Sequence, residues 1–192
     1  LLAGRTSQNL VRAYFLREKL RANGKVKADI GHVHVIGAGA MGGDIAAWCA
    51  RQGLTATLTD LDPKAIAKAI GRASELFEKS LHSGIERRDA FDRLVPDFAG
   101  AGVAKADVVI EAVAEKTDVK HNVLKDIAAR ARKDALIATN TSSIPLETLA
   151  KALPDASRLV GLHFFNPVNR MELVEVVAHD KAAKKMLDKA NA

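Results

Sequence analysis

A histidine and a glutamate in the last third of the sequence have a spacing that suits acid–base chemistry. His163 lies in the apolar segment 159–164, and Glu175 lies in the apolar segment 173–178. If the two segments form an antiparallel hairpin centred on Asn169, His163 faces Glu175 directly, with Cβ atoms about 5 Å apart. A carboxylate beside an imidazole orients the ring and fixes its tautomer, as in a general base with its partner. A histidine in a strand is more often structural, so both interpretations stay open.

A glycine-rich loop, GAGAMG at 37–42, follows the apolar segment 32–36 and precedes an apolar helical pattern. Gly37 permits a tight turn, Gly39 lets a diphosphate approach the backbone, and Gly42 lets the helix pack closely on the strand. A diphosphate would accept hydrogen bonds from the free N–H groups at the start of the helix. The alternative is a glycine turn that binds no ligand.

Asp60 stands at the end of the next predicted strand, 18 residues beyond Gly42. A carboxylate there can accept hydrogen bonds from an adenosine ribose, and it repels a 2′-phosphate. Leu61 and Asp62 follow it, so no arginine is adjacent to neutralise such a phosphate. The loop and the aspartate together predict a site for NAD rather than NADP.

Two further polar segments follow predicted strands. The segment EAVAEKTDVK, residues 111–120, places Glu111 and Glu115 where ligands bind to parallel sheets. An exposed acidic turn is the simpler interpretation of both glutamates. The segment TNTSS, residues 139–143, can hold polar groups of a ligand or cap the helix that follows.

These residues need a scaffold that brings the ends of strands together. Strand and helix patterns alternate from residue 32 onward, which favours an α/β fold, a Rossmann-like doubly wound and mainly parallel sheet. The expected strands are 32–36, 54–59, 107–114, 135–139, 159–164 and 173–178. The expected helices are one that ends at Gly53, 63–80, a further one to about 94, 116–132, 145–152 and a polar helix at the end.

The first 29 residues differ from the rest of the chain. They hold seven basic and two acidic residues, and so carry +5 of the net charge of +6. Apolar residues recur at helical spacing between Ser7 and Arg21, which predicts an amphipathic helix followed by a short linker at 25–29. Such a helix must dock on its own domain or on a preceding one. Because the stretch has this helical pattern, we do not expect it to bind nucleic acid. We therefore expect a connector at 1–29 and one domain at 30–192.

Composition limits the class of protein. The 192 residues are 48% hydrophobic and 27% charged, which suits one globular domain and excludes global disorder. No segment approaches 18 uncharged apolar residues, so we expect no membrane span. Cys49 is the only cysteine, which excludes an internal disulfide and a multi-cysteine zinc site, and we expect no metal. The sequence does not begin with methionine, which suggests a fragment or a processed product.

Four segments together resemble the NAD-binding domain of L-3-hydroxyacyl-CoA dehydrogenases over residues 31–178. They are VIGAGAMGGDIA, VVIEAVAEKTDVK, TNTSSIPL and GLHFFNPVNRMELVEVV. The earlier segment VRAYFLREKLRANGK resembles the connector of the multifunctional alpha subunits of fatty-acid oxidation, where it follows an enoyl-CoA hydratase domain. The resemblance implies NAD-dependent oxidation of 3-hydroxyacyl-CoA to 3-ketoacyl-CoA in β-oxidation.

The resemblance also implies a role for each matching residue. His163 would be the catalytic base and Glu175 its carboxylate partner. Ser142 and Asn166 would surround the nicotinamide and the reacting oxygen. The remaining residues implied to hold or line the cofactor are Gly37, Gly39, Met41, Gly42, Asp60, Glu115 and Lys120.

Two features limit what the resemblance implies. The family continues into a helical domain that closes the substrate cleft and usually forms the dimer contacts, whereas this sequence ends at Ala192. Cofactor binding is therefore expected to survive in this chain, and full activity is not. Lys64, Lys68 and Lys79 suit the phosphates of CoA, and they equally suit a solvated helix face.

Two other functions remain open. Another NAD-dependent hydroxyacid dehydrogenase should lack the His163–Glu175 pair and the TNTSS segment. A non-catalytic dinucleotide-binding or subunit-contact module is the alternative outside enzymes. We expect a cytoplasmic location, as for a bacterial enzyme, with mitochondrial and peroxisomal locations as alternatives.

Overall fold

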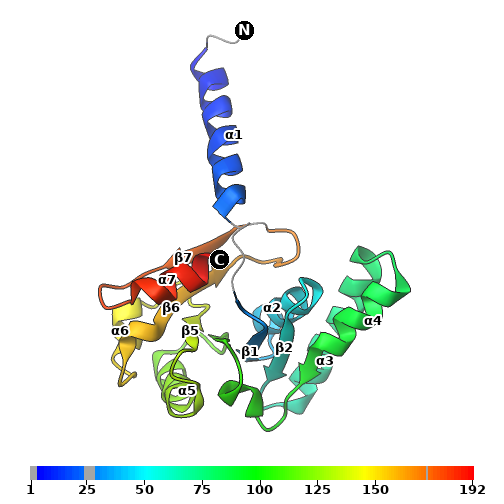
Figure 1. Cartoon of the computed structure of the whole chain (residues 1–192), viewed down its shortest axis with the longest axis vertical. Helices are drawn as coiled ribbons and strands as arrows, with labels where there is room; N and C mark the ends of the chain where they lie inside the picture. Colours follow the sequence, from blue (N-terminus) through cyan, green and yellow to red (C-terminus); the bar gives the residue numbers. More distant parts are fainter. Residues whose placement is uncertain (1–3, 24–28, 172) are drawn as a thin grey trace.

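The computed structural model describes residues 4–23, 29–171 and 173–192. It shows an α/β domain with one long helix outside it (Figure 1). The strands are β1 (His32–Ile36), β2 (Thr55–Thr59), β3 (Leu94–Pro96), β4 (Val108–Glu111), β5 (Leu136–Thr139), β6 (Leu159–Phe164) and β7 (Val174–Val177). The helices are α1 (Arg5–Asn23), α2 (Ala40–Arg51), α3 (Pro63–Ser80), α4 (Gly84–Arg93), α5 (Thr117–Arg130), α6 (Leu146–Ala150) and α7 (Lys184–Asn191), with 3₁₀ turns at Ala101–Ala104 and Ala156–Arg158.

The sheet has the strand order β3-β2-β1-β4-β5-β6-β7. Neighbouring strands are parallel except β6 and β7, which are antiparallel. The order reverses between β1 and β4, so the chain leaves these two central strands in opposite directions and a crevice opens at their carboxyl ends. The expected doubly wound, mainly parallel sheet is therefore confirmed.

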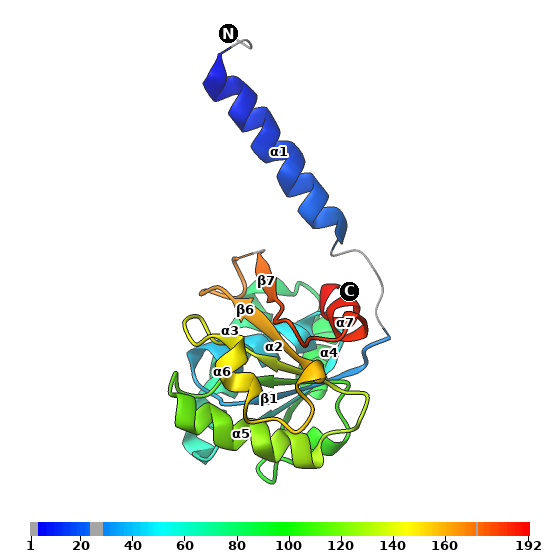
Figure 2. The ribbon, with the colours of Figure 1, turned by 90° about the vertical axis from the view of Figure 1, so that its left-hand side faces the viewer.

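Helices cover both faces of the sheet, as Figure 2 shows. On one face Val35 packs in a cluster with Ile45 of α2 and Phe77 of α3, and Met186 of α7 joins the same cluster. On the other face α5 and α6 pack against alternate residues of the strands, in a cluster that contains Leu124, Leu149 and Leu159. Both layers keep the central strands buried, which makes their carboxyl ends a rigid base for the crevice.

Most expected elements are present, with shifted ends. β1 and β6 have the expected bounds, and α3 begins at Pro63, as expected, behind Asp62, whose side chain accepts a hydrogen bond from Lys64 N. β4 stops at Glu111 rather than continuing to 114, and just beyond its end Val113 N donates a hydrogen bond to the Glu111 side chain instead of to a neighbouring strand. The sequence pattern did not predict β3, whose three residues are too few to show a period.

The amino-terminal helix is present at α1, as expected, but it does not dock on its own domain. Its large apolar side chains are 49–66% exposed; they are Leu10, Val11, Tyr14, Phe15 and Leu16. Figure 1 shows the helix projecting away from the sheet. The expected linker falls mostly on residues 24–28, which lie outside the described part of the chain. None of the described helices combines the length and apolar character that a membrane crossing requires.

Candidate active site

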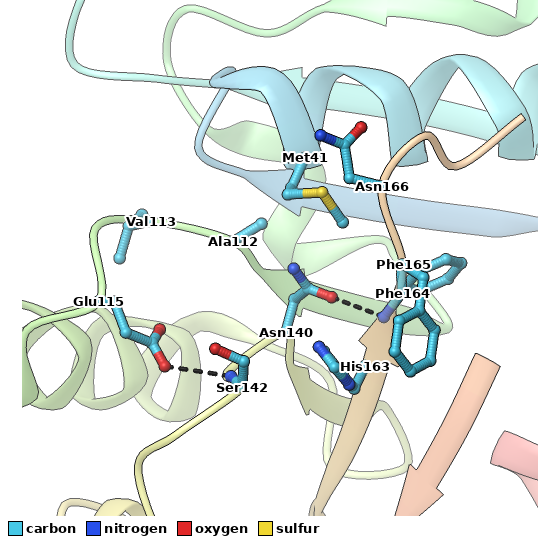
Figure 3. Close-up of a pocket in the computed structure, with 10 residues that line it drawn as sticks. All are labelled: Met41, Ala112, Val113, Glu115, Asn140, Ser142, His163, Phe164, Phe165 and Asn166. Carbon is cyan, nitrogen blue, oxygen red and sulfur yellow. Dashed lines mark hydrogen bonds between the residues drawn. The ribbon is translucent and has the colours of Figure 1, made fainter. Parts of the chain in front are cut away.

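Two cavities lie at the carboxyl edge of the sheet and share Ala112 and Val113 in their walls. The larger has a volume of about 750 Å³, and the smaller about 350 Å³. Residues that line the larger cavity include Gly37, Gly39, Asp60, Leu61, Phe98 and Arg130. Residues that line the smaller one include Met41, Glu115, Asn140, Ser142, His163 and Asn166 (Figure 3). The shared wall makes the two cavities neighbouring parts of one elongated crevice.

The glycine loop is shaped so that a ligand can come close to its backbone. Gly37 has a φ of +102°, and a Cβ there would lie 2.6 Å from the carbonyl oxygen of Ala112. A Cβ at Gly42 would collide with the carbonyl oxygen of Gly37. A Cβ at Gly39 would meet nothing within 4 Å, so the loop is open there. No side chain caps the start of α2, which leaves its first N–H groups available to an anion.

Asp60 is bonded to the glycine loop. Its Oδ2 accepts a hydrogen bond of 2.6 Å from Ala38 N, and its Oδ1 accepts one of 2.9 Å from Asp62 N. Each carboxylate oxygen has a second lone pair, so the side chain can still accept a ribose hydroxyl. Sequence reasoning missed Arg72, which donates to the carbonyl oxygen of Gly39 and pairs with Asp44. Only the packing of α3 on α2 reveals this contact.

The predicted histidine–glutamate pair is formed. β6 and β7 are antiparallel with His163 opposite Glu175, as the hairpin hypothesis requires. The distance between His163 Nδ1 and Glu175 Oε2 is 2.9 Å. Because the carboxylate only accepts, Nδ1 carries the hydrogen in the neutral ring and Nε2 presents a lone pair. His163 also packs against Phe165, with ring centroids 4.6 Å apart. The histidine is therefore held from two sides at the cavity wall.

Glu111 is completely buried, so the expectation of an exposed acidic turn is wrong for this residue. Its Oε1 accepts hydrogen bonds of 2.8 Å from both Lys120 Nζ and Val113 N. Its Oε2 accepts one of 2.7 Å from Thr139 Oγ1. Lys120 is also buried, with 1% exposure. It was expected to line the cofactor site, and it lies behind the wall instead, paired with Glu111.

Glu115 connects this buried pair to the TNTSS segment. Its Oε1 accepts hydrogen bonds from Thr141 Oγ1, Ser142 N and Ser143 N, and its Oε2 lies 3.2 Å from Lys120 Nζ. Burial opposes ionisation of Glu115, but the Thr141 hydroxyl, the Lys120 charge and the Ser142 N–H outweigh it and lower its pKa to about 2. The segment therefore binds a carboxylate instead of capping α6, whose start has no side-chain cap.

Asn140 lines the same cavity, and sequence reasoning did not single it out. Its Oδ1 accepts a hydrogen bond of 2.9 Å from Phe164 N, which places the carboxamide beside the ring of His163 (Figure 3). Its position in the sequence could have indicated it, because Asn140 directly follows β5 at the carboxyl edge of the sheet.

The described residues contain no group of three or more His, Cys, Asp or Glu side chains placed to hold a metal ion.

Comparison with known families shows which family the glycine loop and its surroundings belong to. Residues 32–192 match the family model described as the NAD-binding domain of 3-hydroxyacyl-CoA dehydrogenase. The chain belongs to this family. NAD is therefore the cofactor of the domain, and the open face at Gly39, the free start of α2 and the carboxylate of Asp60 fit its diphosphate and ribose.

Similar proteins agree with the 3-hydroxyacyl-CoA dehydrogenase family. The alpha subunit of the fatty acid oxidation complex of Psychrobacter cryohalolentis is 36% identical over 176 residues, which are 90% of this chain and 24% of that protein. The same subunit of Pseudomonas entomophila is 35% identical over 173 residues, 88% of this chain and again 24% of the relative. This chain thus spans about a quarter of the length of these relatives.

Solved structures show the same fold. The 3-hydroxybutyryl-CoA dehydrogenase of Escherichia coli K12 has a TM-score of 0.81 and 32% identity, covering 85% of this chain and 35% of that one. The (S)-3-hydroxybutyryl-CoA dehydrogenase of Ralstonia eutropha has a TM-score of 0.78 and 32% identity, covering 85% and 61%. Both are named as dehydrogenases of 3-hydroxybutyryl-CoA.

The lysines considered for CoA binding lie on an exposed face of α3 in this dehydrogenase domain. Lys64, Lys68 and Lys79 are all exposed. Lys79 pairs with Glu75 one turn earlier on the same helix, at 3.4 Å. Their geometry is that of a solvated helix face, and none of the three lines the two cavities of the crevice.

Proposed function

We propose that this domain carries out the NAD-dependent oxidation of a 3-hydroxyacyl-CoA to the 3-ketoacyl-CoA, the reaction of fatty-acid β-oxidation. One observation carries the proposal: His163, which lines a cavity that adjoins the glycine loop, is in contact with Glu175 at 2.9 Å. A dinucleotide extended along the crevice would place its reactive ring in that cavity. A base poised there is what alcohol oxidation requires.

The proposed role of His163 follows from its hydrogen bond. Nδ1–H donates to Glu175, so the lone pair of Nε2 takes the proton of the substrate hydroxyl while the C3–H bond breaks. Bound NAD supplies the acceptor for the hydride from C3. The carboxylate of Glu175 then stabilises the imidazolium. Ser142 and Asn166 line the same cavity and offer hydrogen bonds to the reacting oxygen and to the carboxamide of the cofactor.

We further propose that the cofactor is held by the residues that the sequence singled out. Gly37, Gly39 and Gly42 shape the diphosphate turn, and Asp60 binds the adenosine ribose. Met41 and Glu115 line the cavity of His163, and Lys120 supports Glu115 from behind. Their distribution along the crevice supports this assignment.

We also propose that the complete protein is a multifunctional enzyme. Residues 1–29 would connect an enoyl-CoA hydratase domain to this one, and a helical domain would follow. Two exposed apolar regions support this. The first is the side of α1 around Tyr14, and the second lies at β7 and consists of Met171, Leu173, Val174 and Val177, which are 37–45% exposed. Since the relatives are bacterial subunits, we place the protein in the cytoplasm.

The test is NADH oxidation with acetoacetyl-CoA, followed for this chain and for a longer chain that includes the helical domain. We expect turnover with acetoacetyl-CoA and not with pyruvate, the keto acid that a 2-hydroxyacid dehydrogenase would reduce. We expect the longer chain to be much faster because a closed site excludes water. Turnover of pyruvate but not acetoacetyl-CoA would favour another hydroxyacid dehydrogenase. NADH binding without turnover in either chain would favour a non-catalytic module.

A further inference from the structure

Three charged side chains, two of them buried, form a continuous network at the wall of the catalytic cavity. Glu111 is 0% exposed and Lys120 is 1% exposed, with 2.8 Å between their charged atoms. Glu115 is 3.2 Å from the same Lys120 nitrogen, and its side chain is 36% exposed. With two carboxylates and one ammonium, the network has a net charge of −1.

The network is fixed to the wall of the cavity on both sides. Val113 N donates to Glu111, and Lys120 Nζ donates to the carbonyl oxygen of Val113 at 3.4 Å. Val113 lines both cavities, and Glu115 lines the cavity that contains His163. Figure 3 shows Glu115 directed toward Ser142 across this wall. The negative charge therefore cannot move away from the cavity without breaking several hydrogen bonds.

Glu111 adds a second carboxylate to this wall, beside its hydrogen bonds to Val113 N, Lys120 and Thr139. A buried ion pair is often no more stabilising than apolar residues of the same volume, because both charges lose their hydration. Lys120 and Glu115 alone would form a neutral pair at this wall. The additional carboxylate of Glu111 makes the wall negative, and low local dielectric strengthens its field.

We propose that Glu111 is a positioning and charge-setting residue that raises the affinity of the catalytic cavity for NAD⁺ relative to NADH. The nicotinamide ring is positively charged in NAD⁺ and neutral in NADH, so a net charge of −1 beside it stabilises the oxidised form selectively. The affinity for NAD⁺, the form that the oxidation consumes, is therefore higher relative to the affinity for NADH than it would be without this charge. This inference rests on the proposed function, because it places the nicotinamide in the cavity of His163.

The experiment measures dissociation constants of NAD⁺ and NADH by calorimetric titration at constant ionic strength. Glu111→Gln keeps the shape and removes the charge, and we expect it to raise the ratio Kd(NAD⁺)/Kd(NADH) by about five- to twentyfold. Glu111→Asp keeps the charge, so its ratio should stay within about twofold of the wild type even if both affinities fall. Glu78→Gln, an exposed site on α3, is the matched charge control and should not change the ratio.

A second variant decides the matter if Glu111→Gln does not fold. Glu115→Gln removes one negative charge from the same network at a partly exposed position, so it should shift the ratio in the same direction. An unchanged ratio in the folded variant overturns the inference, as does an equal change in Glu111→Gln and Glu111→Asp, which would show an effect of shape. If the wild type binds neither NAD⁺ nor NADH, the proposed function itself fails.

Discussion

The two halves of the crevice are built in different ways. The half around Asp60 and the glycine loop follows β1 and β2, strands that have neighbours on both sides, and its shape comes mainly from backbone. The half around His163 depends on side chains of β6 and of the edge strand β7, and Glu175 is 52% exposed there. The residues that line the first half all belong to the described domain. The second half is exposed to solvent at Glu175, the partner of His163.

This difference separates binding from turnover. Loss of a catalytic side chain at the sheet edge removes no contact from the glycine loop, and a change in the loop leaves the His163–Glu175 pair intact. The network of Glu111, Lys120 and Glu115 lies between the two halves, and it is the only one of the three regions that we expect to affect the relative affinity for the two redox forms. Variants in the catalytic half should therefore change kcat, and variants in the cofactor half should change the affinity for NADH.

The largest expected effect is on turnover. His163→Gln removes the proton acceptor, and we expect kcat for acetoacetyl-CoA reduction to fall by about 10²–10⁴-fold, the usual contribution of a positioned base. The dissociation constant of NADH should stay within about twofold of the wild type, because His163 is not part of the glycine loop. Steady-state kinetics and NADH titration measure the two quantities. Wild-type kcat in the variant would show that His163 is not the base.

The next effect is on the free energy of unfolding. It concerns a buried histidine of β1, the strand that leads into the glycine loop. His34 is completely buried on β1, and its Nδ1 is 2.7 Å from Thr57 Oγ1 and 3.8 Å from Asp97 Oδ2. Its Nε2 has no hydrogen-bond partner among the described residues. Burial, helped by the charges of His32 and Arg130 and opposed by Asp97, lowers the pKa of His34 to about 4.

This lowered pKa predicts a pH dependence of folding. The unfolded chain takes up a proton on His34 near pH 6.5 and the folded chain does so only near pH 4, so the free energy of unfolding should be greatest above pH 6.5 and decrease by about 2–3 kcal/mol as pH falls to 4. Denaturant titrations between pH 4 and 8 measure it. His34→Asn should lose this part of the slope, and an unchanged slope would contradict the assignment.

The catalytic half and the network behind it differed in how far the sequence could predict them. The spacing of residues gave the register of β6 and β7, because both segments have clear strand patterns and the turn between them is symmetrical about Asn169. It could not predict the burial of Glu111. Charged residues are rarely buried unless paired, and its partners Lys120 and Thr139 lie nine and 28 residues away. Only the packing of α5 and β5 on β4 brings them together.

A smaller effect tests the cofactor half directly. Asp60→Ala should weaken NADH binding by about 1–3 kcal/mol, because it removes a charged acceptor from the cavity and the bond to Ala38 N. The affinity for NADPH should change less, since the carboxylate no longer repels the 2′-phosphate. Asp62→Ala is the control: it removes the cap of α3 but lies outside the cavity, so it should lower stability by about 1 kcal/mol and leave NADH affinity unchanged. Equal NADH and NADPH affinities in the wild type would contradict the role of Asp60.

The smallest effect tests how much the exposed carboxylate of Glu175 contributes to kcat through His163. Glu175→Gln keeps the hydrogen-bond acceptor and removes the charge that stabilises the imidazolium of His163. Because Glu175 is 52% exposed, water can partly replace that stabilisation, and we expect kcat to fall by only about tenfold with little change in KM. If Glu175 acts through His163, the double variant His163→Gln/Glu175→Gln should be no slower than His163→Gln alone within about threefold. Steady-state reduction of acetoacetyl-CoA by the four proteins gives this comparison. Losses that multiply would mean that Glu175 contributes independently of the histidine, for example by binding substrate at the open edge of the sheet.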